Sequence, residues 1–135
     1  MGKKRTRADA SETRQEWIAA VGALMSQLEQ WAAQANWDVA TEDKEITESL
    51  LGTYTVPALK FRIPGGGIFY AEPIARDIIG ADGRVDLYAW PTLHRLLLIR
   101  ENDGWSVTTD SRLDWPEPWG RQTFLKLAES LTKAP

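Results

Sequence analysis

The sequence predicts a single α+β domain, in which a long N-terminal helix and a short C-terminal helix flank an antiparallel β-meander of five to six strands. Hydrophobic residues recur with a helical period near both ends of the chain and with a period of two between them. Short turns rich in glycine, proline, asparagine and aspartate separate the alternating segments. No repeat or linker divides the chain, so we expect two-layer packing of helices on one sheet.

Residues 11–36 carry the clearest helical pattern, and Asn36 is its expected end. The hydrophobic stripe consists of Trp17, Val21, Leu24, Leu28, Trp31 and Ala35. Its 4-3 spacing also fits a coiled coil with a second copy. However, tryptophan is a poor residue for such a seam and only about three heptads exist, so packing on the protein's own sheet is favoured.

Alternation begins after Trp37 and continues to residue 109. In residues 53–63 the hydrophobic phase slips next to Pro57, which predicts a bulge or an edge position because proline cannot donate to a ladder. The segments "PGGG" and "ENDG" predict hairpin turns, and Asp82-Gly83 predicts a type I′ turn. Residues 121–131 return to helical spacing and predict the second helix.

Charge is distributed unevenly along the chain. Four basic residues against Asp9 give the first ten residues a net charge of +3, which leaves −6 for the rest because the whole chain carries −3. We expect residues 1–10 to form a disordered basic tail and residues 11–135 to form the domain. We expect no nucleic-acid contact by the acidic domain, and we consider such contact only for the tail. The basic residues of this tail are Lys3, Lys4, Arg5 and Arg7.

The sequence contains no cysteine and no apolar run of about 20 residues, the length that spans a membrane. We therefore expect a cytoplasmic protein without a membrane span.

None of the possible chemical motifs is specific. The "PGGG" glycines precede a strand and lack the lysine and hydroxyl that open the helix of a nucleotide-binding loop. His94 is the only histidine, and no spacing places a carboxylate beside it. We therefore expect no catalytic residue, no cofactor and no metal site.

One strand is apolar on both faces. In "LHRLLLIR", Leu96 and Leu98 share one phase, while Leu97 and Ile99 share the other. A strand of this kind needs cover on both faces of the sheet. The long helix covers one face, and the other needs the second helix, a partner or a ligand.

The segment "DWPEPWG" places Trp115 and Trp119 in a stiff, extended stretch before the last helix. It is interpreted either as a clamp that fastens this helix or as an exposed aromatic patch for a partner. Our functional hypothesis is a non-enzymatic intracellular interaction domain that binds another protein or forms a homodimer through the open sheet face. The alternative is a small-molecule binder or enzyme with a pocket near Tyr88, Trp90 and His94. The predicted partner-binding residues are Trp115, Trp119, Tyr88, Trp90, Tyr70 and Tyr54.

Overall fold

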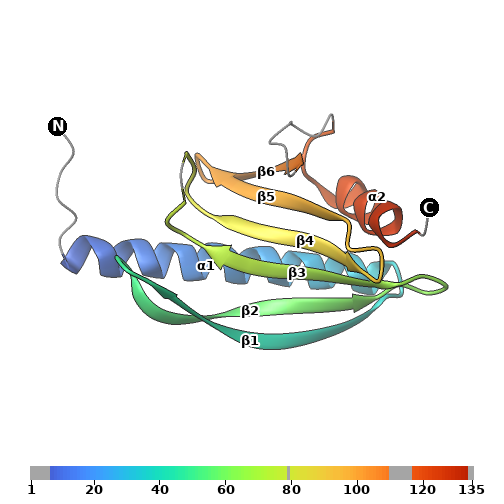
Figure 1. Cartoon of the computed structure of the whole chain (residues 1–135), viewed down its shortest axis with the longest axis horizontal. Helices are drawn as coiled ribbons and strands as arrows, with labels where there is room; N and C mark the ends of the chain where they lie inside the picture. Colours follow the sequence, from blue (N-terminus) through green and yellow to red (C-terminus); the bar gives the residue numbers. More distant parts are fainter. Residues whose placement is uncertain (1–6, 79, 110–116, 134–135) are drawn as a thin grey trace.

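The computed structural model describes residues 7–78, 80–109 and 117–133, and it has the predicted α+β arrangement (Figure 1). Along the chain, the elements are α1 (Arg7–Gln34), β1 (Asp38–Glu48), β2 (Gly52–Arg62), β3 (Ile68–Ala75), β4 (Arg84–Trp90), β5 (Arg95–Glu101), β6 (Gly104–Thr109) and α2 (Arg121–Thr132). The strands form one antiparallel sheet in the order β1-β2-β3-β4-β5-β6. Each strand therefore pairs with its neighbours in the chain, which confirms the meander.

Helix α1 runs along the sheet for 28 residues, or about 42 Å (Figure 1). It begins at Arg7, so it includes the last four residues of the segment that we expected to be a tail. It ends at Gln34, two residues before the predicted stop at Asn36, and Asn36 has a φ of 63°. The Trp37 amide donates to the Ala32 carbonyl at 2.9 Å, which satisfies one of the last carbonyls of the helix.

Both helices pack on the same face of the sheet and enclose one hydrophobic core. Phe124 of α2 lies at its centre, with ring centroids 5.5 Å from Phe61, 6.0 Å from Phe69 and 5.8 Å from Trp31 of α1. The α1 stripe thus contacts the protein's own sheet, as favoured over a coiled coil. Most tryptophans contribute to this core: Trp17 and Trp37 are buried in it, and Trp31, Trp105 and Trp119 pack against it.

Strand β2 pairs with β1 along its whole length but with β3 only from Leu59 to Arg62. Before Leu59, β1 and β2 form a two-stranded ribbon, and such ribbons twist more strongly than wide sheets. The register between Asp43 and Pro57 is continuous, so Pro57 causes no bulge. Instead Pro57 occupies the edge position that was the other expectation, because no residue of β3 pairs with it.

The end of this ribbon is fastened to the core by a chain of hydrogen bonds. Trp17 Nε1 donates to Tyr54 Oη at 3.0 Å, and Tyr54 Oη donates to Glu48 Oε2. The Glu48 carboxylate also accepts the backbone amides of Arg76 and Asp77, at 3.1 and 2.8 Å. Burial, together with the Glu48 carboxylate, raises the pKa of Tyr54 well above its ordinary value.

The structure contains the hairpin predicted at "ENDG" but not the type I′ turn predicted at Asp82-Gly83. Asn102 and Asp103 both have positive φ in the β5–β6 hairpin, as a type I′ turn requires. The type I′ turn predicted at Asp82-Gly83 is wrong, because Arg100 and these two residues exchange backbone hydrogen bonds that extend the sheet. Gly83 is needed for another reason: a Cβ atom there would lie 2.2 Å from the Trp17 ring. Because Gly83 has no side chain, the Trp17 indole can contact the backbone at this position.

Candidate functional site: the uncovered face of the sheet

Neither described helix packs on the opposite face of the sheet, the uncovered face, although Asp86 and Leu97 are buried on it. Alternate residues of the strands point to this face, and four of them form a row across the sheet. The register aligns Lys60 with Tyr70, Tyr70 with Tyr88, and Tyr88 with Arg95. The tyrosine rings stack at 4.8 Å and 16°. Lys60 Nζ lies 6.0 Å from the Tyr70 centroid, and the Arg95 guanidinium carbon lies 5.0 Å from the Tyr88 centroid. The rings stack on each other and a cation lies over each, so they are poorly placed to stack on nucleic-acid bases.

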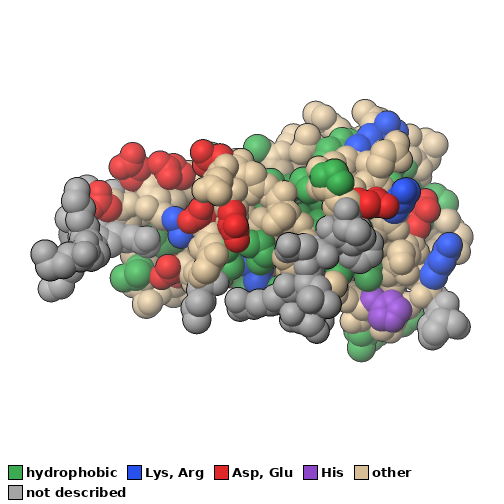
Figure 2. Space-filling model, turned by 90° about the horizontal axis from the view of Figure 1, so that it is seen from above, with side chains coloured by type: hydrophobic (Ala, Val, Ile, Leu, Met, Phe, Trp, Pro, Cys, Tyr) green, Lys and Arg blue, Asp and Glu red, His purple; other side chains and the backbone are tan. Residues whose placement is uncertain are grey.

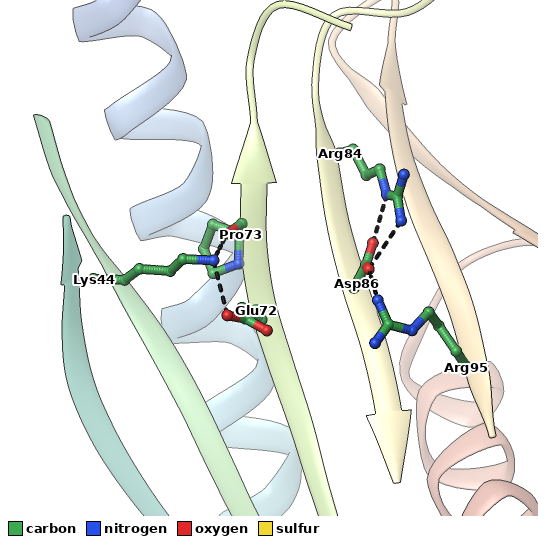
Figure 3. A network of polar contacts seen from close by, with 6 residues as sticks. All are labelled: Lys44, Glu72, Pro73, Arg84, Asp86 and Arg95. Carbon is green, nitrogen blue, oxygen red and sulfur yellow. Dashed lines mark hydrogen bonds and ion pairs between the residues drawn. The ribbon is translucent and has the colours of Figure 1, made fainter. Parts of the chain in front are cut away.

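A second row on this face is made of ion pairs (Figure 3). Asp86 is fully buried, and Arg84 and Arg95 both bind its carboxylate, Arg84 through two hydrogen bonds of 2.6 and 3.0 Å. A buried carboxylate is costly unless it is paired in this way. Asp86 therefore fastens β4 to β5 on the side of the sheet away from the helices.

Lys44 makes a similar connection across the gap between β1–β2 and β3. Its ammonium group donates to Glu72 Oε1 at 2.8 Å and to the Pro73 carbonyl at 2.7 Å (Figure 3). These contacts lie next to the place where β2 stops pairing with β3. The lysine thus ties the ribbon to the rest of the sheet by side-chain bonds where backbone bonds have ended.

Tyr88 shares the environment of Glu72. Burial raises the pKa of Tyr88 to about 12, and the negative charge of Glu72 adds to this effect. At neutral pH the Tyr88 hydroxyl is therefore a proton donor, and it is poorly suited to act as a general base.

The curvature of the ribbon leaves a hollow of about 770 Å³ on this face. Its wall is the acidic strand β1, and Tyr70, Glu72 and Tyr88 line the opposite side. This hollow is not the pocket that the sequence suggested, because neither Trp90 nor His94 is among its lining residues.

The β4–β5 turn carries the most prominent apolar surface. Trp90 is 54% exposed and Leu93 is 65% exposed, and with Leu50 they are the exposed large hydrophobic side chains of the described ranges. Figure 2 shows the histidine of this turn next to exposed hydrophobic side chains.

The turn is fixed in place by several bonds. The Leu93 amide donates to the Ala89 carbonyl at 3.0 Å, and Thr92 Oγ1 donates to the Leu131 carbonyl of α2. Leu93 also has a φ of 63°, a conformation that costs a leucine about 1–2 kcal/mol. A strained and anchored turn thus presents two large hydrophobic side chains to solvent.

The residues predicted for partner binding fall into three groups. Tyr70, Tyr88 and Trp90 lie on the side of the sheet away from the helices. Tyr54 lies in the core instead, and Trp119 packs on Trp31 and Phe124 with its buried indole nitrogen unpaired among the described residues. Trp115 is outside the described part of the chain.

Sequence reasoning missed the charged residues of this face. Period-two alternation places Arg84, Asp86 and Tyr88 on one phase of β4, but only the strand register brings Arg95 of β5 to Asp86. It also missed Leu93, which the sequence pattern assigned to a strand rather than to an exposed turn. His94 is exposed in that turn, and no contact of its side chain with a described carboxylate is found.

Other site types receive no geometric support within residues 7–78, 80–109 and 117–133. These residues contain no group of three histidine, aspartate or glutamate side chains arranged to hold a metal ion. None of their helices combines the length and hydropathy needed to cross a membrane. Comparisons of the chain with family models, with curated proteins and with solved structures found no match.

Proposed function

We propose that this protein is a binding domain for another protein, and that its contact surface is the β4–β5 turn together with the adjoining uncovered sheet face. The proposal keeps the cytoplasmic location expected from the cysteine-free sequence. The observation that carries it is the exposure of Trp90 and Leu93 on one anchored turn.

Two physical arguments support this choice. Tryptophan is enriched among the residues that contribute most to protein–protein affinity, because its large ring fills pockets on a partner. In addition, an anchored turn loses little conformational freedom when it is bound, so more of the contact energy appears as affinity. The hydrogen bonds at Ala89 and Thr92 provide this anchoring.

Tyr70 and Tyr88 lie beside the same surface. Ile68 of β3 pairs with Trp90 of β4, and the Tyr70–Tyr88 pair lies two residues further along both strands. A partner seated on the turn would thus extend over the polar row, where Lys60 and Arg95 offer charged contacts. This arrangement, an apolar anchor beside polar groups, is typical of protein interfaces.

The alternative, a small-molecule site at Tyr88, Trp90 and His94, is less well supported. The hollow beside Tyr88 is not lined by the other two residues. The stacked pair and the ion pairs also occupy the polar groups that a small ligand would need.

Site-specific photo-crosslinking tests the proposal. The full chain is produced with p-benzoylphenylalanine in place of Trp90, and a matched chain carries it in place of Leu50, which is exposed on the β1–β2 turn. Irradiation in cell extract from the source organism is expected to yield a discrete adduct from position 90 and none from position 50. The same adducts from both positions, or none from either, would contradict the proposed surface.

A further inference from the structure

A second surface of the molecule is the free edge of the sheet at β1. This strand is 11 residues long and ends the strand order on that side. The opposite edge strand, β6, has six residues. A long free edge offers backbone groups to which another chain can add as a further strand.

The hydrogen bonds at the β4–β5 turn show toward which neighbouring strand each β4 residue directs its backbone N–H and C=O groups. The Ala89 amide donates to the His94 carbonyl, and the Ala89 carbonyl accepts from Leu93, so Ala89 directs both groups toward β5. Consecutive residues of an antiparallel strand direct these groups to alternate sides. Tyr88 therefore directs its groups toward β3.

The same alternation extends across the sheet through the register. Tyr88 pairs with Tyr70, so Ala71 directs its groups toward β2, where it pairs with Leu59. Lys60 then directs its groups toward β1. The amide of Ile63, which has the same parity as Leu59, donates toward the β3 side, to Gly67 at 3.4 Å, and this agrees with the assignment.

On β1, Ala40 pairs with Lys60 and directs its groups inward. The odd-numbered residues of β1 consequently direct their N–H and C=O groups out of the sheet. These residues are Val39, Thr41, Asp43, Glu45 and Thr47. Pro57 fits this scheme, because its missing N–H would point to the side on which β2 has no partner at that position.

The side chains along this edge are acidic. Asp38, Glu42, Asp43 and Glu45 are exposed and form no ion pair with another described residue. Lys44 is the one basic residue in the strand, and its ammonium group is turned across the sheet to Glu72 and Pro73. Within the described residues, the edge therefore presents negative charge without a compensating cation.

We propose that the β1 edge binds an extended segment rich in lysine or arginine from another protein, which adds to the sheet as a seventh strand. The outward backbone groups supply the hydrogen bonds, and the four carboxylates select basic side chains. A second copy of this chain is a poorer occupant, because two such edges side by side would bring like charges together. This surface is separate from the β4–β5 turn and does not depend on it.

The probe is the peptide Lys-Val-Lys-Thr-Lys-Val-Lys-Thr-Lys, with a control in which glutamate replaces every lysine. Amide hydrogen exchange of the full chain is followed by NMR. With the peptide at ten times its Kd, the amides of Val39, Thr41, Asp43 and Glu45 should exchange about tenfold more slowly. Those of Ala40, Glu42 and Lys44 are already bonded to β2 and should change little. The glutamate peptide should have no effect.

Three variants sharpen this test. Glu42→Lys with Glu45→Lys should weaken peptide binding by about tenfold or more, whereas Glu101→Lys with Glu129→Lys makes the same charge change elsewhere and should weaken it less. Asp43→Pro removes one outward N–H donor and keeps the hydrogen bonds to β2. This variant should therefore fold normally but bind the peptide poorly. Far-ultraviolet circular dichroism checks the fold of each variant.

Three results would overturn the proposal. They are the absence of saturable binding of the lysine peptide, equal slowing of odd-numbered and even-numbered amides of β1, and equal weakening by both pairs of charge reversals. In the first case the acidic residues would serve to keep the edge from pairing with other chains, the common role of charges on edge strands.

Discussion

Phe69 and Tyr70 are neighbours in β3, yet they belong to two different environments. Phe69 points to the helices and is buried among Phe61 and Phe124, whereas Tyr70 points away and stacks on Tyr88. Dispersion and removal of apolar surface from water stabilise the first environment. The second is held by ion pairs, ring stacking and cation–π contacts, which contribute less per residue when they are partly exposed to water. The comparison separates a face that is packed against the helices from a face that is held mainly by polar and aromatic contacts.

The largest expected difference comes from truncating these two neighbours. Phe69→Ala should lower the free energy of unfolding by about 3–5 kcal/mol, since it leaves a cavity in the core. Tyr70→Ala should lower it by only about 1 kcal/mol, because a half-buried ring and one stacking contact are lost. Urea unfolding monitored by circular dichroism measures both. Equal losses would mean that the two faces do not differ in the way described.

Gly83→Ala tests the contact between the sheet and α1. The added Cβ would lie 2.2 Å from the Trp17 ring, and the backbone φ of 150° also disfavours a side chain. We expect a loss of about 3 kcal/mol, at the upper end of the range for overpacking a core. Gly65→Ala is the matched control, because that glycine also has positive φ but no atom lies within 4 Å of the added Cβ. If both variants lose the same stability, backbone strain alone explains the effect.

Asp86→Asn tests the ion pairs of the uncovered face. It keeps the shape of the side chain but removes the charge that binds Arg84 and Arg95. We expect a loss of about 2 kcal/mol, the usual contribution of a hydrogen bond to a charged group. The loss should shrink in 1 M salt, which screens the charges of the partly exposed arginines. A loss as large as that of Phe69→Ala, and independent of salt, would contradict this view of the face.

The last expected effect is the pH dependence that Tyr88 contributes. Its pKa is about 12 in the folded protein against an ordinary value of 10.0, so the unfolded state releases this proton first as the pH rises. Stability should therefore fall between pH 10 and pH 12. Absorbance at 295 nm should show Tyr88 ionising at about pH 12, and Glu72→Gln should lower the pKa of Tyr88 in part, because burial remains. A Tyr88 that titrates at its ordinary pKa would contradict the burial and the Glu72 contact.

The sequence was sufficient to predict the order of the elements because each one has its own local signal. The α1 stripe, the Asn36 end, the "ENDG" turn and the alternation of β4 are all read within a few residues. The uncovered face was harder to predict, since it depends on register. No local pattern indicates that Arg95 lies beside Tyr88, or that Lys44 reaches Glu72.

Two errors have clear physical causes. Tyr54 shares a phase with Val56 and was expected on the second sheet face, but the twist of the β1–β2 ribbon turns it to Trp17. Asp82-Gly83 has the composition of a tight turn, yet Gly83 is required by the close approach of an indole from α1. Both outcomes depend on contacts between residues far apart in the sequence.

The most direct test of the proposed function is the affinity of the partner captured at position 90 for the double variant Trp90→Ala, Leu93→Ala. Both side chains are largely exposed, so the free energy of unfolding should change by less than about 1 kcal/mol. We expect affinity to fall by about tenfold or more while the fold is retained, as for truncation of interface anchors. Unchanged affinity in the folded double variant would contradict the proposal that this turn binds the partner.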